Sequence, residues 1–547
     1  MKLINDEIST KDTKIQQYYE KFIQSQQLEI VQDEELINIS FVKKLNIKQL
    51  KIAYCKNIEP ILMCGNIIEL SIQNCNITSV DGLQLDNLEF LNLSSNKLTS
   101  ITNIKNFKLL KELNISNNQL IDLYGIQFLK LLRKLKINGN DIKDISILRH
   151  LSRLKQLDLS ENISINLEAL KNMDQITQLN ISYNKSKNLD YLETLTNLED
   201  LDISYNDRID TSSLKNIVKL IKLNVQAVRL QNINFLGKYS SLKELDLSFN
   251  DNLDMKPLQY MCQLTKLNIS NNQLIDISFL SELNNLEYIN LSSNFEIDLE
   301  PLRCIDKITY LNLSWCNLSD TNVLQQLIHL KELDISNNSR IEISSLKNLS
   351  NLIKLFSNCN ELKDISVLQT LLNLEEVELN ENFEIDITPL QYLIKLTYLS
   401  LYNCGIYEIS SLRPLLKLQY LQISSNQIIY ISPLEKMKEL SFLDIQSNKI
   451  NNFIAIQQHQ YFKQYQIDCQ EDVTEEEIQI ANVMDIIDSS ALCKNKLVYY
   501  HKQIKLSFQY RKQQISSFLK TVHNTQEYQI KKIQQQLSKL QYDETYQ

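Results

Sequence analysis

The segment LSRLKQLDLSEN, from Leu151 to Asn162, contains the frame Leu-x-x-Leu-x-Leu-x-x-Asn. The same frame recurs in LTNLEDLDISYN, from Leu195 to Asn206, and its last position returns 17 times at intervals of 22 residues between Asn96 and Asn448. A unit of this length cannot bury its apolar face alone and does so only against its neighbours. The sequence therefore predicts a solenoid of stacked units rather than a set of globular domains.

Two features of each unit predict its local structure. Apolar residues separated by one position, such as Leu157 and Leu159, alternate with polar neighbours, which is typical of a short strand. The Asn that follows has an amide able to satisfy backbone groups in a tight turn. We therefore expect one strand per unit in a parallel sheet, and a ladder of Asn side chains beside it.

The segments between the strands have apolar residues at steps of three, which predicts turns and short helices on the outer face. Four prolines share one place, seven residues after the Asn position, where a helical first turn accepts proline. They are Pro257, Pro301, Pro389 and Pro433. Val228 occupies the Asn position but cannot hydrogen-bond, so we expect a local irregularity there.

Alternate units differ in where their first outer apolar residue lies. It lies three positions after the Asn in one set, as at Ile297, and two positions after it in the other, as at Leu274. This alternation suggests growth by duplication of a pair of units, 44 residues long.

Composition indicates a folded chain inside the cell. Hydrophobic residues make up 43% of 547 residues, which is typical of globular proteins. Neither the charged start, MKLINDEISTKDTK, nor any later window has the apolar run of an export signal or membrane span. We therefore expect a cytoplasmic protein, with the nucleus as a second possible location, that is neither secreted nor membrane-spanning.

The ten cysteines follow the repeat rather than a disulfide or zinc pattern. Cys75, Cys316 and Cys404 stand at the Asn position, where a thiol can partly replace the amide as a donor. We expect buried, reduced thiols, as in the cytosol. Asn-x-Ser sequences in the strands, as at Asn290, point the same way, because export would expose them to glycosylation.

The longer frame L-x-x-L-x-x-L-x-L-x-x-N-x-I-x-x-I-x-x-L, present with small lapses in residues 264–286 and 418–440, resembles the 22-residue class of leucine-rich repeats. That class includes a regulatory subunit of protein phosphatase type one, bacterial internalins and many proteins of single-celled eukaryotes. The resemblance implies an α/β solenoid, a right-handed horseshoe whose concave parallel sheet binds protein partners. We expect about 20 repeats over residues 27–473, with irregular units at both ends.

The concave face is expected to be hydrophilic and mildly acidic. Asn or Asp predominates four residues before the Asn position, and Ser two residues before it. Aromatic residues interrupt these columns, and such side chains are enriched at binding hot spots. The candidate binding residues are Tyr288, Tyr310, Trp315, Tyr398, Tyr402, Tyr420 and Phe442. The alternative is cross-strand stacking without a ligand.

The array shows no catalytic pattern. His150, His329 and His459 are far apart in repeat number, and neither a Gly-rich phosphate loop nor a metal-spaced Cys/His set occurs. We therefore expect no enzymatic activity, no cofactor and no metal site.

Both ends depart from the repeat. Residues 1–26 are predicted to form a helical cap, and residues 474–547 a helical tail that opens with a capping box at Thr474 and Glu477. Residues 494–539 contain ten Lys or Arg and one acid, whereas the whole chain has a net charge of −9. The tail could pack beside the solenoid, pair as a coiled coil in self-association, or bind a membrane or nucleic acid.

The favoured function is a non-catalytic scaffold that binds a protein partner on the concave face. The alternatives are a regulatory subunit of a protein phosphatase, for which family resemblance is the basis, and a cytoskeletal or ciliary structural adaptor.

Overall fold

The computed structural model describes residues 27–31, 48–54, 66–83, 85–206, 209–318, 320–339, 341–450, 455 and 464–466. The expected helical cap at 1–26 and the basic tail at 474–547 lie outside these described residues. The chain divides into two compact units, Met1–Ser400 and Leu401–Gln547.

The first unit contains a parallel sheet in which each strand pairs with the next strand along the chain. Its strands are β1 (Gln27–Val31), β2 (Gln49–Ala53), β3 (Glu69–Gln73), β4 (Phe90–Asn92), β5 (Glu112–Asn114), β6 (Lys134–Lys136), β7 (Gln156–Asp158), β8 (Gln178–Asn180), β9 (Asp200–Asp202), β10 (Lys222–Asn224), β11 (Glu244–Asp246), β12 (Lys266–Asn268), β13 (Tyr288–Asn290), β14 (Tyr310–Asn312), β15 (Glu332–Asp334), β16 (Lys354–Phe356), β17 (Glu376–Glu378) and β18 (Tyr398–Ser400). The predicted parallel sheet is therefore confirmed in this unit.

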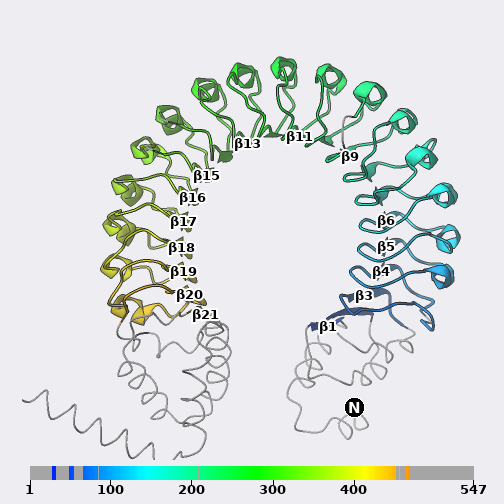
Figure 1. The fold of residues 1–547 in the computed structure, drawn as a ribbon, viewed down its shortest axis with the longest axis horizontal. Helices are drawn as coiled ribbons and strands as arrows, with labels where there is room; N and C mark the ends of the chain where they lie inside the picture. The colour runs from blue at the N-terminus through cyan, green and yellow to red at the C-terminus, as the bar shows by residue number, and fades with distance from the viewer. Residues whose placement is uncertain are drawn as a thin grey trace, which may run out of the picture. The chain divides into compact units, whose positions relative to one another are not determined.

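Short 3-10 helices follow the strands. They are η3 (Thr102–Asn106), η4 (Ile126–Phe128), η5 (Ser146–His150), η6 (Leu167–Leu170), η7 (Asp190–Thr194), η8 (Thr211–Asn216), η9 (Asn234–Lys238), η10 (Lys256–Tyr260), η11 (Ser278–Glu282), η12 (Glu300–Cys304), η13 (Asn322–Gln326), η14 (Ser344–Asn348), η15 (Ser366–Thr370) and η16 (Thr388–Tyr392). Within this unit the strands line the inner, concave side and the helices lie on the outer side (Figure 1). Pro257, Pro301 and Pro389 lie in the first turns of η10, η12 and η16, as predicted.

The second unit repeats the same layout over its described residues. It contains β19 (Tyr420–Gln422), β20 (Phe442–Asp444), β21 (Gln464–Gln466), η17 (Ser410–Leu412) and η18 (Ser432–Lys436). β20 pairs in parallel with both β19 and β21. Strand pairing extends into the predicted end units, since Leu28 pairs with Leu50 in the first unit and Tyr465 pairs with Leu443 in the second.

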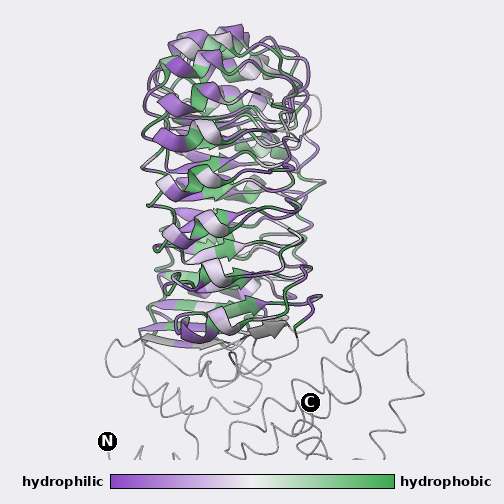
Figure 2. Cartoon of the chain, turned by 90° about the vertical axis from the view of Figure 1, so that its left-hand side faces the viewer, coloured by the Kyte–Doolittle hydropathy of each residue, from purple (hydrophilic) through white to green (hydrophobic). Residues whose placement is uncertain are grey.

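The core lies between the strands and the helices of each coil. The two strand leucines of one repeat, Leu157 and Leu159, are 3% and 0% exposed. Leu148 and Leu154, from the return segment before that strand, are fully buried. Hydrophobic segments recur at corresponding positions of successive coils (Figure 2). Each repeat therefore buries its apolar residues against its neighbours, as a solenoid requires.

Asn side chains join consecutive turns, and Asn338 shows how. It is fully buried, and its Nδ2 donates hydrogen bonds to the carbonyl oxygens of Leu313 and Ile335, both at 2.9 Å. Its Oδ1 accepts from the backbone N–H groups of Cys316 and Leu318, at 3.1 and 3.0 Å. One amide thus satisfies backbone groups of two repeats, which confirms the predicted ladder.

The prediction of an irregular backbone at Val228 is wrong. Ala227 and Arg229, on either side of it, both have φ of 53°, and their counterparts Asn271 and Gln273 have φ of 54° and 56°. The N–H of Ala227 donates to the carbonyl oxygen of Ser248 at 3.0 Å, as such turns do in other repeats. Val228 itself is fully buried, so backbone hydrogen bonds and apolar packing hold this turn without the amide.

The alternation between repeats is visible in the turn after the Asn position. Gln273 and Asn317, directly after that position, have φ of 56° and 53°. In the repeats between, the left-handed residue comes one position later, at Asn252 and Glu296, with φ of 62° and 61°. Two turn conformations therefore alternate, and they account for the one-residue difference in where the next apolar side chain is buried.

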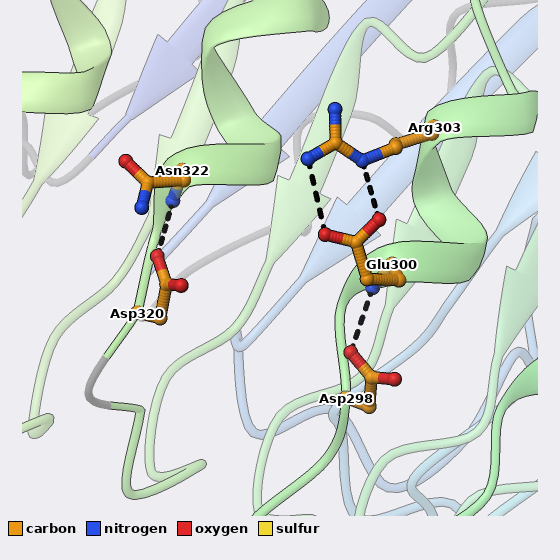
Figure 3. Close-up of polar contacts among 5 residues, drawn as sticks. All are labelled: Asp298, Glu300, Arg303, Asp320 and Asn322. Atoms are coloured by element: carbon orange, nitrogen blue, oxygen red, sulfur yellow. Dashed lines mark hydrogen bonds and ion pairs between the residues drawn. The ribbon is translucent and has the colours of Figure 1, made fainter.

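Aspartate side chains begin the outer helices. Oδ1 of Asp298 accepts from the N–H of Glu300 at 3.0 Å, and Oδ1 of Asp320 accepts from the N–H of Asn322 at 2.7 Å (Figure 3). Arg303 forms an ion pair with Glu300 one turn later. This capping recurs every 22 residues in most of the first unit, as at Asp144 and Asp276. It explains why Asn and Asp recur four residues after the ladder position.

Candidate protein-binding surface

The exposed face of the sheet is built from the residues that flank each buried strand leucine. In β9, Leu201 is fully buried, whereas Asp200 and Asp202 on either side of it are partly exposed. Because strands of the first unit pair in register at 22-residue intervals, equivalent flanking residues form columns across the sheet. Two shallow hollows, with volumes of about 310 and 280 Å³, lie on this face, and Asp200 and Asp202 line both.

The Asn/Asp column has a structural role that the sequence pattern did not indicate. Oδ1 of Asp246 accepts from the N–H and the Oγ of Ser248 at 2.9 and 2.6 Å, and its Oδ2 accepts from Nδ2 of Asn268 at 2.8 Å. Ser248 is fully buried, and most of its counterparts are less than 9% exposed. The expectation that the serine column contributes exposed surface is therefore wrong, because the serines turn back to end the strands.

Tyr288 and Tyr310 meet on this face. They occupy the first positions of β13 and β14, and their rings stack with centroids 4.1 Å apart and an angle of 6° between planes. Both side chains are partly exposed. Burial raises the pKa of Tyr288, and the neighbouring Tyr310 raises it further. The hydroxyl of Tyr288 therefore stays protonated and can both donate and accept a hydrogen bond.

Charged side chains of alternating sign extend the same column on both sides of the tyrosine pair. On one side, Oε1 of Glu244 lies 3.0 Å from Nζ of Lys222 and 3.6 Å from Nζ of Lys266. On the other side, Lys354 pairs with Glu376 at 2.7 Å. These pairs are partly exposed, so each adds little to stability and remains open to exchange with a partner's charges.

The remaining predicted residues are placed as follows. Trp315 follows β14 at the turn and is 55% exposed, away from the column that contains Tyr310. Tyr398 begins β18 in the first unit and is partly exposed. In the second unit, Tyr420 and Phe442 stack with centroids 4.2 Å apart, and Tyr402 is 36% exposed. Two stacked pairs therefore form among these residues, Tyr288 with Tyr310 in the first unit and Tyr420 with Phe442 in the second.

A third stacked pair was not predicted as a pair. Tyr183 and Tyr205 follow β8 and β9 at the turns, and their rings stack with centroids 4.2 Å apart and an angle of 13° between planes. Both occupy the position before the ladder Asn in consecutive repeats, and this shared position was the signal available in the sequence.

The described thiols differ in exposure. Cys75, Cys316 and Cys404 are buried, as expected, but Cys262 and Cys304 are exposed on the outer segments, so the expectation of burial is wrong for these two. Sγ of Cys316 lies 3.3 Å from the carbonyl oxygen of Leu291, which confirms that a thiol partly replaces the ladder amide. Burial raises the pKa of Cys316 to about 11, so this thiol is protonated at neutral pH.

Within the part of the chain that the structure describes, His, Cys, Asp and Glu side chains form no group of three that could hold a metal ion. None of the described helices combines the length and apolarity needed to cross a membrane. His459 lies outside the described residues.

Two protein-family models match parts of the chain. A model described as leucine-rich repeats in two copies matches residues 65–106 and 262–304, and a model of a single leucine-rich repeat matches residues 194–218 and 307–321. No curated protein matches the chain significantly.

Several solved structures are similar. An internalin of Listeria monocytogenes, InlF, is 29% identical, with 62% of this chain and 87% of that chain covered and a TM-score of 0.39. The ectodomain of the Arabidopsis thaliana receptor kinase GASSHO1/SCHENGEN3, solved with CASPARIAN STRIP INTEGRITY FACTOR 2, is 20% identical over 78% and 57%, with a TM-score of 0.48. TLR13, solved with ssRNA13, is 21% identical over 78% and 70%, with a TM-score of 0.57. The likeness to TLR13 supports the solenoid fold alone.

Proposed function

We propose that the chain is a leucine-rich repeat protein and a non-catalytic scaffold that binds a protein partner on the sheet face of its first unit. Arrays of this family generally serve as protein-binding scaffolds, and their extended concave surfaces provide the area needed to contact a partner. The observation that carries the proposal is the stacked Tyr288–Tyr310 pair, set between charged pairs on that face.

The pair has the properties of a binding hot spot. Two tyrosine rings offer a large apolar area with little rotamer entropy to lose, and each hydroxyl can hydrogen-bond to a partner. Charged residues lie on both sides of this apolar centre along the same column, from Lys222 to Lys266 on one side and Lys354 with Glu376 on the other. A protein with an apolar anchor and charged edges fits such a surface.

The partner should be lost when the ring pair is removed. Full-length protein carrying Tyr288→Ala and Tyr310→Ala is expected to retain its partner at least about tenfold less well than the unmodified protein, because the hot spot is gone. The measurement is quantitative mass spectrometry of proteins captured from cells that express the chain naturally.

The matched control carries Tyr260→Ala and Tyr392→Ala. These tyrosines lie on the outer helices η10 and η16 and are 76% and 50% exposed, so their loss should leave capture unchanged. Circular dichroism must show that both double variants keep the fold. Equal capture by the two variants would rule out the tyrosine pair as the anchor.

Regulation of a phosphatase and a cytoskeletal or ciliary role stay predictions, as does self-association, or membrane or nucleic-acid contact, through the tail. We also infer a cytoplasmic location. It is supported by the thiols, because Cys316 and Cys404 are buried free cysteines at the ladder position whose sulfur atoms lie near backbone carbonyl oxygens.

A further inference from the structure

Four side chains on the sheet face of the first unit form a row whose two ends carry opposite charges. They are the first residues of β6 to β9, in order Lys134, Gln156, Gln178 and Asp200 (Figure 1). Strand pairing places each of them directly beside the next. All four are at least partly exposed, and all four line the hollow of about 310 Å³. This hollow therefore has a cationic end and an anionic end.

The polar ends of the four side chains in the row are left open by the fold. Within the described part of the chain they form no hydrogen bond or ion pair, and this includes Lys134 and its other neighbour in the column, Glu112. The adjacent column differs. Oδ1 of Asp202 accepts from the N–H and the Oγ of Ser204 at 2.9 and 2.6 Å, and its Oδ2 accepts from Nδ2 of Asn224 at 3.0 Å. The row thus offers polar groups that folding does not use.

The anionic end of the row has no cation bound to it from the described chain. Lys222 is the next residue in the column after Asp200, but its Nζ lies 3.0 Å from Oε1 of Glu244 instead. Burial raises the pKa of Asp200, Lys222 lowers it, and Asp202 and Glu244 raise it again. A cation from a partner would therefore stabilise the carboxylate of Asp200.

The length of the row matches an extended peptide. Neighbouring strands lie about 4.8 Å apart, so Lys134 and Asp200, separated by three strand spacings, are about 14 Å apart along the row. An extended chain advances about 3.4 Å per residue and alternates its side chains between two faces, so residues i and i+4 share a face and are also about 14 Å apart. Between the charged ends, the amides of Gln156 and Gln178 can donate to and accept from a peptide backbone.

We propose that this hollow binds an extended segment of the partner protein in which an acidic residue and a basic residue are four positions apart. The acidic side chain pairs with Lys134, the basic side chain pairs with Asp200, and the backbone between them hydrogen-bonds to Gln156 and Gln178. The inference rests on the proposed function, because it takes the sheet face as the binding surface. It uses other residues than the tyrosine pair, so the two can be tested separately.

Peptides of identical composition test the spacing of the two charges. Full-length protein is titrated with fluorescein-labelled decapeptides of serine and threonine that contain one glutamate and one arginine, and binding is followed by anisotropy at about 50 mM salt. The peptide with the charges four positions apart should bind at least about fivefold more tightly than the peptide with them three positions apart, in which they face opposite ways. Peptides with the glutamate alone or the arginine alone should bind as weakly as the latter.

Charge reversals then locate each end of the bound peptide. Lys134→Glu should weaken binding of the four-spaced peptide at least about tenfold, because it replaces an attraction by a repulsion, and should favour a peptide with arginine at both charged positions. Asp200→Lys should weaken the same peptide and favour one with glutamate at both positions. Circular dichroism confirms that the variants are folded, which is expected because Lys222 and Glu244 already begin other strands of this sheet.

The matched controls reverse charges on the outer side. Lys238→Glu lies in η9, and Asp306→Lys lies two residues after η12, so these positions are also three repeats apart. Both side chains are exposed, and neither variant should change the affinity for any of the peptides.

Three results would overturn the inference. Equal affinity for the two spacings, or equal losses in the outer variants, would show bulk electrostatic attraction. Equally tight binding of the peptide with glutamate alone would show a simple anion site at Lys134 and Lys136. The third is no binding of the four-spaced peptide up to about 1 mM.

The proposed function has its own test, capture of the partner through the tyrosine pair. If capture depends on that pair but the four-spaced peptide does not bind, the inference fails and the proposed function stands. If the peptide binds as expected but capture does not depend on the tyrosines, the hollow is a binding site and the tyrosine pair is not the anchor.

Discussion

Replacing Asn338 with alanine is expected to lower the free energy of unfolding by about 3 kcal/mol. The change deletes donors to the carbonyl oxygens of Leu313 and Ile335 and the acceptor for the N–H groups of Cys316 and Leu318. The site is fully buried, so water cannot replace these partners without opening the turn. Urea denaturation followed by circular dichroism measures the loss.

Hydrogen exchange measures the effect of the same substitution at individual backbone amides. The amides of Cys316 and Leu318 should exchange faster in Asn338→Ala, because their acceptor is gone. Asn338→Cys is the matched control, since Cys316 shows that a thiol in this place still reaches the carbonyl oxygens, and it should lose less stability. Unchanged stability in Asn338→Ala would contradict the ladder's role.

Val228→Asn, which restores the amide to the one turn that holds Val, should raise the free energy of unfolding by about 1 kcal/mol.

Replacing Gly125 with alanine should cost about 3 kcal/mol of stability. Gly125 has φ of 110° at the start of η4, and a Cβ there would lie 2.8 Å from the carbonyl oxygen of Thr102 and 3.0 Å from that of Ile101. Both obstacles are backbone atoms of the preceding repeat, so they cannot rotate away. The strained left-handed backbone and the close contact of the added Cβ both destabilise the variant, so the midpoint of urea denaturation should fall.

Gly139→Ala is the matched control for this prediction. Gly139 also has a left-handed φ, of 64°, but a Cβ there meets the Oδ1 end of the Asn117 side chain, which can move. Other repeats place Ala227, Glu161 and Tyr183 at this position with φ of 53°, 57° and 56°. The variant should lose only about 1 to 2 kcal/mol, the strain of the left-handed backbone alone. Equal losses in the two variants would show that close approach between repeats at Gly125 is not what demands glycine.

The repeat frame made most of the fold predictable. Alternating leucines such as Leu157 and Leu159 determine which strand face is buried, and the constant interval determines which residues pair, as Leu201 does with Leu223. Proline position located the outer helices for the same reason, because Pro257 needs a helical first turn. These predictions depend on backbone periodicity, which one sequence displays repeatedly.

What could not be predicted depends on side-chain conformation and on neighbours in space. Val228 differs from its counterparts in chemistry, yet backbone hydrogen bonds from both adjoining repeats maintain its turn. Ser248 fits the pattern of an outward residue but turns back to Asp246. Which aromatic residues stack, as Tyr183 does on Tyr205, follows from side-chain torsions that the spacing alone does not specify.

The measurement that tests the central claim most directly is photo-cross-linking at the sheet face. A photoreactive phenylalanine analogue placed at Tyr310, on the concave side, should form a covalent adduct with the captured partner. The same analogue at Tyr260, 76% exposed on the outer helix η10, should form none. An adduct at Tyr260 without one at Tyr310 would contradict the proposal that the partner binds the sheet face.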